Sequence, residues 1–359
     1  MTRLERALKW EFWPYQIFYI PAYFYVLWLG LRNLKPTFFT AANPGMEYGG
    51  FVEYSKGRMY ELLPERYVPR TLSLPPIGLL PDQHELQRQL HEAGIDFPLI
   101  AKPDHGERGL GVEKLANMRE LADYLAVATG TTLLQEFIPG DREYGVLYCR
   151  MPDEQTGWIS SVVIKEQLSV RGDGKTALAD LIDGNRRATA HRAAIRHALR
   201  ASLTSVPAAE ESITLSEIGN HSRGATFRSG MHLVGKGTRA RQLARVFDEL
   251  SNQVPGFYIG RYDVKAADEE ALLAGRFKVL ELNGVNSEPA HIYDPDNSLL
   301  RAYRDLFRHW KTIYRISRAN IRRGAPVTSL RELVSAIREH FKDAARLREG
   351  LSASMGQSE

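Results

Sequence analysis

Two stretches decide the fold of this chain: GFYIGRYDVKA at residues 256–266 and GRFKVLELN at residues 275–283. Both alternate apolar and polar side chains, which predicts two paired strands of a hairpin. Side chains two residues apart share a strand face, so Arg261 lies beside Asp263, and Glu281 beside Asn283. Oxygen donors of this kind suit Mg²⁺, and an arginine beside them neutralises an oxyanion. The same alternation also fits the solvent face of an edge hairpin, and both interpretations stay open at this point.

A second segment, FPLIAKPDHGERGLGV at residues 97–112, places Lys102 at the end of an apolar strand. A loop with Gly106, Gly109 and Gly111 follows. Lysine supplies positive charge to phosphates, and glycines let backbone N–H groups approach them closely. His105 in this loop, like His221 further on, is expected to be an ordinary loop residue, because neither has zinc-ligand spacing.

A third segment, TLLQEFIPGDREYGV at residues 132–146, ends a strand at Gln135, Glu136, Phe137 and Ile138. Backbone groups there can bind the edge of an adenine, and Glu143 can accept hydrogen bonds from ribose hydroxyls. Each segment alone is weak, because glycine loops and Lys-Pro pairs are common in turns. Their order, ending in the hairpin, predicts a site for a nucleotide and a metal.

In this order the motifs resemble the ATP-grasp superfamily, and within it the carboxylate–amine ligases such as D-alanine–D-alanine ligases, cyanophycin synthetases and glutathione synthetases. The resemblance covers roughly residues 75–295. It implies two α+β lobes that clamp ATP, with Mg²⁺ or alternatively Mn²⁺. It also implies a reaction in which a carboxylate becomes an acyl-phosphate that an amine attacks, with release of ADP and phosphate.

The resemblance implies a role for each matching residue. Lys102 contacts phosphate under a lid formed by Gly106, Gly109 and Gly111, and Glu143 holds the ribose. The hinge around adenine is formed by Gln135, Glu136, Phe137 and Ile138. The metal ligands are Asp263, Glu281 and Asn283, and Arg261 stabilises the acyl-phosphate and the tetrahedral intermediate.

Two further segments resemble the cyanophycin-synthetase branch. VIKEQLSVRGDGKTALADLI at residues 163–182 places Lys165 where a base faces phosphate, although its Gly-Asp-Gly also fits a simple hairpin turn. NHSRGATF at residues 220–227 resembles a loop beside the γ-phosphate, with Asn220, Ser222 and Gly224 as contacts. Ala225 replaces that branch's second glycine, which puts the contacts of Asn220 and Ser222 in doubt.

The remaining segments alternate irregularly between strands and helices, which predicts an α+β fold with mixed sheets. We expect an N-terminal region at 1–70, a lid lobe at 71–140, a catalytic lobe at 141–300 and a helical segment at 301–359. The N-terminal region is expected to hold a short strand after residue 35 and a proline-rich linker over residues 64–81. It is too short for the domain that usually precedes an ATP-grasp unit, so the family's substrates do not transfer directly.

Residues 12–31 form an uncharged aromatic run, FWPYQIFYIPAYFYVLWLGL, about as long as one bilayer crossing. Three interpretations stay open: a membrane span, a segment that Pro21 breaks and that dips into one leaflet, and a helix packed on the protein's own core. The bases of residues 301–323 face one acid, Asp305, and this block fits either a solvated helix face or an anionic lipid surface. We expect contact with the inner face of a membrane and a cytoplasmic catalytic unit.

The composition of the 359 residues is that of a globular protein with a net charge of +4. Cys149 is the single cysteine, which excludes an intramolecular disulfide and fits a reducing compartment. No nucleic-acid-binding motif accompanies the basic block. The chain is therefore expected to join a small or lipid-linked carboxylate to an amine. The alternatives are a phosphotransferase acting on a hydroxyl, and a membrane-bound protein that binds nucleotide without catalysis; the oligomeric state is not predicted.

Overall fold

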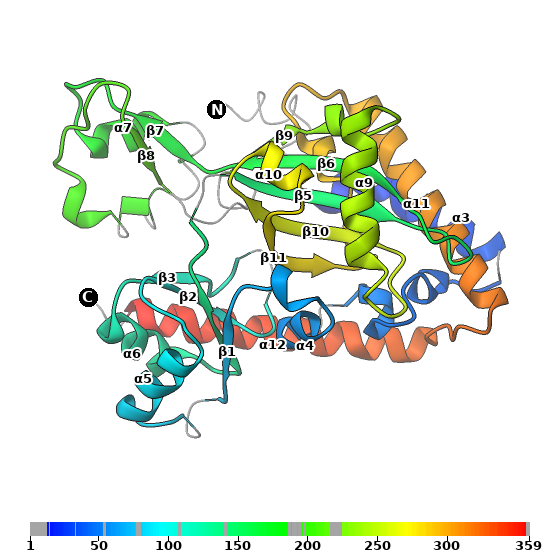
Figure 1. Cartoon of the computed structure of the whole chain (residues 1–359), viewed down its shortest axis with the longest axis horizontal. Helices are drawn as coiled ribbons and strands as arrows, with labels where there is room; N and C mark the ends of the chain where they lie inside the picture. The colour runs from blue at the N-terminus through cyan, green and yellow to red at the C-terminus, as the bar shows by residue number, and fades with distance from the viewer. Residues whose placement is uncertain are drawn as a thin grey trace.

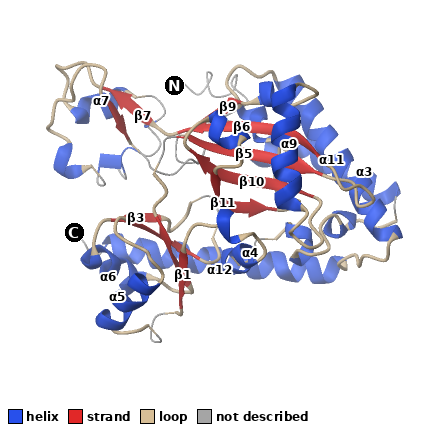
Figure 2. Cartoon of the chain, in the orientation of Figure 1, coloured by secondary structure: helices blue, strands red, loops and turns tan. Residues whose placement is uncertain are grey.

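The structure, a computed structural model, holds two antiparallel sheets side by side, with a small third unit beyond them (Figures 1 and 2). It describes residues 13, 15–32, 34–52, 55–76, 80–106, 109–139, 142–185, 188, 192, 195–196, 199–215 and 225–356. Mixed helices and antiparallel strands confirm the predicted mixture of secondary structure. Clamping of ATP between two lobes stays a proposal.

The smaller sheet has four strands in the order β1-β4-β2-β3. Its strands are β1 (Thr71–Leu74), β2 (Leu99–Pro103), β3 (Glu113–Leu115) and β4 (Thr132–Glu136). Helices α5 (Gln83–Glu92) and α6 (Met118–Val127) pack on it, and the Asp82 side chain caps α5. The expected linker over residues 64–81 is wrong in part, because β1 lies within it. Pro69, Pro75 and Pro76 flank β1, an edge strand, where proline is tolerated.

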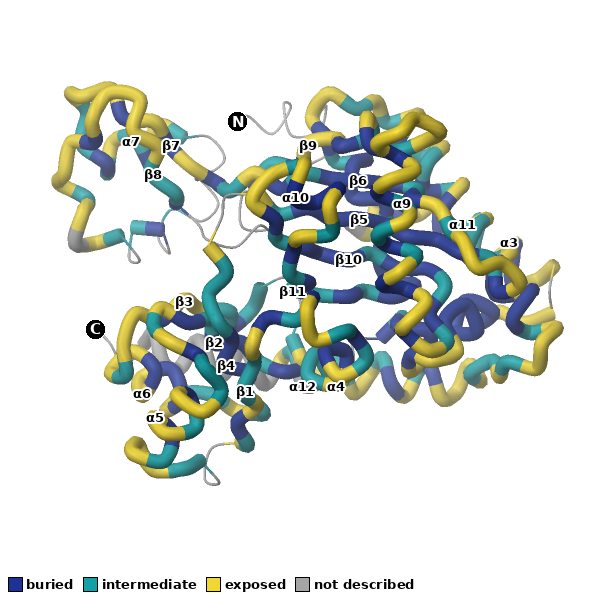
Figure 3. The backbone as a smooth tube through the Cα atoms, in the orientation of Figure 1, coloured by how far each residue is buried: buried dark blue, intermediate teal, exposed yellow. Residues whose placement is uncertain are grey.

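The larger sheet has five strands in the order β11-β10-β5-β6-β9, all antiparallel. They are β5 (Arg142–Cys149), β6 (Trp158–Glu166), β9 (Thr226–Ser229), β10 (Ile259–Ala266) and β11 (Phe277–Asn283). One face packs under α9 (Thr238–Ser251), whose Leu243, Phe247 and Leu250 recur at helical spacing and are fully buried. Tyr144 and Tyr262 fill this core. Strands β5, β6 and β10 are buried along most of their length (Figure 3). Part of the opposite face is also apolar, with Cys149 and Ile259 buried in a second core, and the rest carries the polar side chains described below.

The predicted hairpin of β10 and β11 is confirmed, with the short helix α10 (Glu269–Leu273) in its connection. A separate pair of strands, β7 (Ser169–Arg171) and β8 (Ser212–Thr214), packs with α7 (Leu178–Gly184). The Gly-Asp-Gly segment is not a simple hairpin turn, because β7 pairs with the distant β8. Instead, Asp173 Oδ1 accepts hydrogen bonds from the backbone N–H groups of Lys175 and Thr176. Of the helix expected over residues 185–203, nine residues lie outside the described residues.

The N-terminal part differs from its prediction. The expected short strand after residue 35 is instead a 3₁₀ turn, η2 (Phe38–Ala41), buried under α11. Helix α2 (Tyr15–Phe18) and helix α3 (Ile20–Arg32) are interrupted at Tyr19, two residues before Pro21, which lies in the first turn of α3. None of the helices in the described part of the chain is both long enough and apolar enough to cross a bilayer.

Two long helices end the chain, as their periodicity predicted. Helix α11 (Leu299–Arg322) lies beside α3 behind the larger sheet, and α12 (Leu330–Gly356) runs beneath both sheets toward α6 (Figure 1). Shorter elements complete the described chain: η3 (Glu47–Gly50), α4 (Lys56–Glu61), η4 (Glu65–Tyr67), η6 (Arg200–Ser202), η8 (Met231–Leu233) and η9 (Ala290–Tyr293). Among these, α4 lies where the two sheets approach each other.

Candidate functional site

The polar face of the β10–β11 hairpin is confirmed by the strand register. Arg261 lies opposite Asn283, and Asp263 lies opposite Glu281, so all four side chains share one face. A bulge after Asp263 shifts the register of the remaining pairs. These residues lie on the face of the sheet opposite α9.

The neighbouring strands add an acid and a base to this face. Lys165 on β6 lies opposite Glu143 on β5 and forms an ion pair with it. Lys165 Nζ also lies 3.1 Å from Asp263 Oδ2, while Arg261 donates from Nε to Asp263 Oδ1 at 2.8 Å. Burial alone would raise the pKa of the Asp263 carboxyl, but Arg261 and Lys165 together hold it below its ordinary value. Asp263 is therefore ionised between two fixed cations.

Lys165 stays positively charged for the same reason. Burial opposes its charge, but the nearby Asp263 and Glu143 carboxylates raise the pKa of the ammonium above its ordinary value. Burial raises the pKa of Glu143 despite the attraction of Lys165. Glu143, the residue expected to hold the ribose, thus belongs to an ionic cluster with Lys165 and Asp263.

The two remaining hairpin side chains line a small pocket with Lys56, Met59 and Asn286. Within the described residues, no hydrogen bond or ion pair engages the Glu281 carboxylate, and Asn283 Nδ2 has no partner although it is buried. Asp263 accepts three polar contacts, which leaves part of its acceptor capacity free. Two carboxylates and an amide are the donor chemistry that Mg²⁺ takes, so these three residues fit a divalent cation. Across the part of the chain that the structure describes, no group of three or more His, Cys, Asp or Glu residues gathers as a metal cluster.

A second buried lysine comes from the smaller sheet. Lys102 Nζ donates to Tyr60 Oη at 2.6 Å and to Gln135 Oε1 at 3.0 Å. Tyr60, on α4, donates in turn to the Leu280 carbonyl of β11 at 2.6 Å. Burial, together with the nearby Lys56 cation, lowers the pKa of the Lys102 ammonium to about 7. Tyr60 thus links Lys102 of the smaller sheet to the β10–β11 hairpin of the larger sheet.

The glycine loop begins beside this lysine. Gly106, Gly109 and Gly111 all have positive φ, and a β-carbon on Gly111 would meet the Pro103 ring at 2.9 Å. Lys56 Nζ donates to the Gly106 carbonyl at 2.6 Å, which ties one end of the loop to α4. The exposed His105 lies 3.3 Å from Asp104 through its Nδ1 atom. A lid role for the three glycines remains a prediction.

The proposed adenine hinge has its side chains engaged within the protein. Gln135 Nε2 donates to Thr71 Oγ1, and Glu136 accepts from Arg70. The Phe137 ring makes cation–π contacts with Lys114 and Lys265, whose ammonium nitrogens lie 4.1 and 5.1 Å from the ring centroid. Ile138 is half-buried beyond the end of β4. The Glu136 backbone N–H also donates to the Arg70 carbonyl, and Gln135 pairs with Thr71 and Ile100 within the sheet. An adenine-binding role for residues 135–138 remains a prediction.

The proposed phosphate loop of Asn220, Ser222 and Gly224, together with His221, lies outside the described residues. Its assignments remain predictions. Ala225, which replaces the glycine of the resembled motif, is fully buried against Val163 and Ala290.

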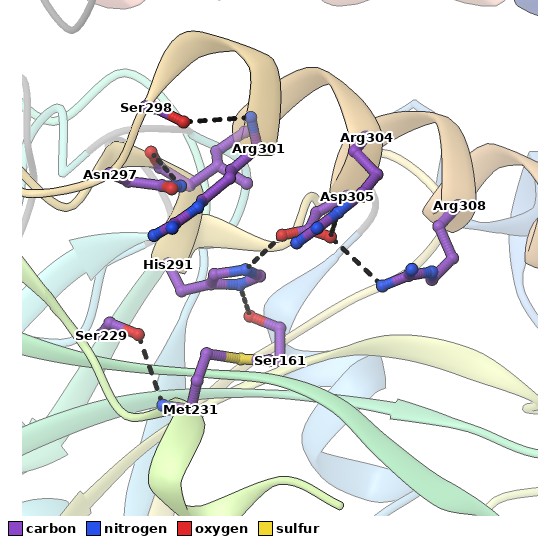
Figure 4. A network of polar contacts seen from close by, with 11 residues as sticks. Ser161, Ser229, Met231, His291, Asn297, Ser298, Arg301, Arg304, Asp305 and Arg308 are labelled. Atoms are coloured by element: carbon purple, nitrogen blue, oxygen red, sulfur yellow. Dashed lines mark hydrogen bonds and ion pairs between the residues drawn. The ribbon is translucent and has the colours of Figure 1, made fainter.

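A polar network on the same face of the sheet joins β6 to α11 (Figure 4). Ser161 Oγ shares a hydrogen bond of 2.7 Å with His291 Nδ1, and His291 Nε2 lies 3.3 Å from Asp305 Oδ2. Ser161 is 1% exposed, so its hydroxyl ties the sheet to η9 and is closed to substrates. His309, one turn further along α11, bonds the Ser287 carbonyl, and burial lowers its pKa to about 4.

Sequence reasoning missed the residues of α4. Lys56 and Tyr60 contact partners more than 40 positions away, and no local spacing marks such contacts. Asp104 was also missed: its Oδ1 accepts from Ser55 Oγ and the Gly57 backbone, which positions α4 against the glycine loop. The available signal was a tyrosine within the apolar face of a short helix, where a buried hydroxyl requires a partner.

No family model matches the chain, and no curated protein matches it. Among solved structures it is similar to a D-alanine–D-alanine ligase from Bacillus anthracis, at 13% identity and a TM-score of 0.40 over 75% of this chain and 67% of that one. The same ligase complexed with ATP gives 13% identity and a TM-score of 0.37 over 74% of this chain and 62% of that one. A bifunctional glutathione synthetase from Pasteurella multocida gives 14% identity and a TM-score of 0.36 over 74% of this chain. The chain spans 38% of that synthetase. These are two of the enzyme types that the sequence motifs resemble.

Proposed function

We propose that this protein is a Mg-ATP-dependent ligase that activates a carboxylate as an acyl-phosphate for attack by an amine. The observation that carries the proposal is the meeting of two buried lysines on one hairpin. Lys102 reaches β11 through Tyr60, and Lys165 reaches β10 through Asp263. The Glu281 carboxylate acts electrostatically on both sides: it opposes part of the lowering that burial imposes on the pKa of Lys102, and it helps to raise the pKa of Arg261.

This arrangement supports phosphoryl transfer because the charge that develops on the phosphate oxygens requires fixed cations. Lys102, Lys165 and Arg261 supply that charge at buried positions. Asp263, Glu281 and Asn283 would hold Mg²⁺ or Mn²⁺, which neutralises phosphate charge when bound. The backbone of residues 135–138 would hold adenine, Glu143 the ribose, and Asn220, Ser222 and Gly224 the far side of the γ-phosphate.

The chemistry requires no nucleophile from the protein. A substrate carboxylate oxygen attacks the γ-phosphorus and ADP leaves with the bridging oxygen. The amine nitrogen then attacks the acyl carbon, phosphate leaves, and the nitrogen releases its proton. Arg261 is placed to stabilise the oxyanion of the second step, since its guanidinium is fixed by two bonds to Asp263. The substrates would be small or lipid-linked acids and amines, handled on the cytoplasmic side.

The test is an ADP-release screen of the purified chain against carboxylates, with and without amines, and against hydroxyl acceptors. We expect release that requires both a carboxylate and an amine. Glu281→Gln should abolish this ADP release, whereas Glu249→Gln, on the exposed face of α9, should not. Release with a hydroxyl acceptor alone would identify a phosphotransferase. ATP binding without any release would leave a nucleotide-binding protein and refute the ligase.

A further inference from the structure

The outward face of α3 is apolar along its whole length. Large side chains recur on it at three- and four-residue spacing and are exposed, with Phe24 at 70%, Leu31 at 64% and Leu34, just beyond the helix, at 91%. The members of this apolar stripe are Ile17, Ile20, Tyr23, Phe24, Leu27, Trp28, Leu31 and Leu34. The opposite face is buried through Ala22 and Leu29, so the stripe is not the side that α3 packs on the core. A contiguous exposed apolar patch of this kind marks an interaction surface.

The outward face of the neighbouring α11 is basic. Its exposed basic stripe consists of Arg301, Arg304, Arg308, Lys311, Arg315, Arg318 and Arg322. Buried Leu306, Ile313 and Ile316 occupy the opposite face of the helix. Exposure of this stripe is compatible with both alternatives that the sequence left open, a solvated helix face and an anionic lipid surface.

The apolar and basic stripes form one surface. Tyr303 stacks on Phe18 and Phe307 packs on Tyr25, so α3 and α11 lie side by side in the same direction. Arg304 and Arg308 directly follow Tyr303 and Phe307 in sequence. One residue rotates the side chain by about 100° around the helix axis, which places both arginines on the outer side of the contact between the two helices. Both helices turn their buried faces to the protein, so both stripes face away from it.

The one acid of α11 between Arg301 and Arg323 is withdrawn from this surface. Asp305 is turned inward to His291, and its other oxygen accepts from Arg304 and Arg308 (Figure 4). Its side chain is 15% exposed. The stripe therefore presents positive charge without an exposed acid of its own.

We propose that this surface binds an anionic lipid bilayer, with the apolar stripe of α3 among the acyl chains and the basic stripe of α11 on the headgroups. Charge decides between a bilayer and a second copy of the chain. In a symmetric dimer of this face, basic stripes would meet one another, because the stripe itself offers no exposed carboxylate to pair with them. An anionic headgroup layer pairs with every base at once, and Trp28, under the Arg32 guanidinium at 4.8 Å, suits the headgroup boundary. Apolar insertion and basic attraction together hold a protein on a bilayer where one alone would not.

The test is co-sedimentation of the full chain with phosphatidylcholine vesicles, with and without phosphatidylserine. We expect strong binding only with phosphatidylserine. Lys311→Glu/Arg315→Glu should weaken it by more than 30-fold, since each base at an anionic surface contributes about fivefold and reversal adds repulsion. Phe24→Ser/Leu31→Ser should leave binding that high salt removes, whereas the wild type resists high salt. The matched controls are Lys236→Glu/Arg245→Glu, near and on α9 across the sheet, and Val206→Ser.

Three results would overturn the proposal: no binding to either vesicle, unchanged binding in both stripe variants, or a concentration-dependent dimer that the stripe variants dissolve. Light scattering without vesicles detects the last of these. The proposal does not rest on the ligase chemistry. ADP release by the stripe variants, measured without vesicles, should equal that of the wild type, so failure of one proposal is distinguishable from failure of the other.

Discussion

Nucleotide binding should depend on pH through one lysine. Burial and the nearby Lys56 cation lower the pKa of Lys102 to about 7, against an ordinary 10.5. Near neutrality this lysine is therefore charged in only about half of the molecules. A polyphosphate placed against it favours the ammonium, so the bound state should carry the proton that the free state lacks.

The magnitude follows from the size of the shift. Above pH 7 each further unit reduces the charged fraction of free Lys102 by up to tenfold, which costs binding about 1.4 kcal/mol per unit. Affinity for ATP should thus fall by about 50-fold between about pH 7 and pH 9, if bound Lys102 regains an ordinary pKa. At about pH 8, binding should take up close to one proton per ATP, since about nine-tenths of free Lys102 is neutral there.

Calorimetry in two buffers of different ionisation enthalpy measures both quantities. Lys102→Met should bind ATP weakly, with neither the proton uptake nor the slope. Lys165→Met should also bind weakly but keep the slope, because Asp263 and Glu143 raise the pKa of Lys165 and it does not titrate in this range. Lys236→Met, an exposed lysine before α9, should behave as the wild type. Equal proton uptake by the wild type and Lys102→Met, or affinity independent of pH, would refute the reasoning.

Three further predictions concern other parts of the site. Asn283→Ala should lower ADP release at ordinary magnesium, with partial rescue at high magnesium, because it deletes one neutral ligand; turnover equal to the wild type would remove Asn283 from the site. Tyr60→Phe should lower the free energy of unfolding by about 1–3 kcal/mol in urea titrations, since it leaves Lys102 Nζ one bond short and the Leu280 carbonyl unpaired. His309, with its pKa lowered to about 4, should make stability fall by roughly 3 kcal/mol as pH drops from 6.5 to 4, because the unfolded chain takes up a proton there and the folded chain does not. His309→Gln should flatten that part of the profile, and an unchanged slope would contradict the assignment.

The polar face of the hairpin was predictable because it depends on a local rule. A period of two places Arg261 with Asp263 and Glu281 with Asn283, whatever the rest of the chain does. The contacts of Lys102 were not predictable in the same way. Its partners Tyr60 and Gln135 arrive from another helix and another strand, and their meeting depends on how the sheets pack.

Errors in the N-terminal part have a different physical cause. Strand β1 lies among prolines, which signal a linker locally but are compatible with a sheet edge. Phe38 and Phe39 have strand propensity, yet they form a 3₁₀ turn because burial under α11 offers their rings more contact than an extended pairing would. Tertiary packing overrides local preference in both places.

The two buried lysines differ in a way that fits a division of labour. Lys165 forms ion pairs with Glu143 and Asp263 before any ligand arrives. These pairs keep its ammonium group charged and fix its position from two sides. Lys102 has no carboxylate in contact, and its charge is made only when an anion is present to stabilise it. In the proposed nucleotide site, Lys102 would gain a proton as the phosphates bind and lose it as they depart. A lysine that titrates in this way would hold the departing product less firmly than a permanently charged one, and its low pKa follows from burial and from the neighbouring Lys56 cation.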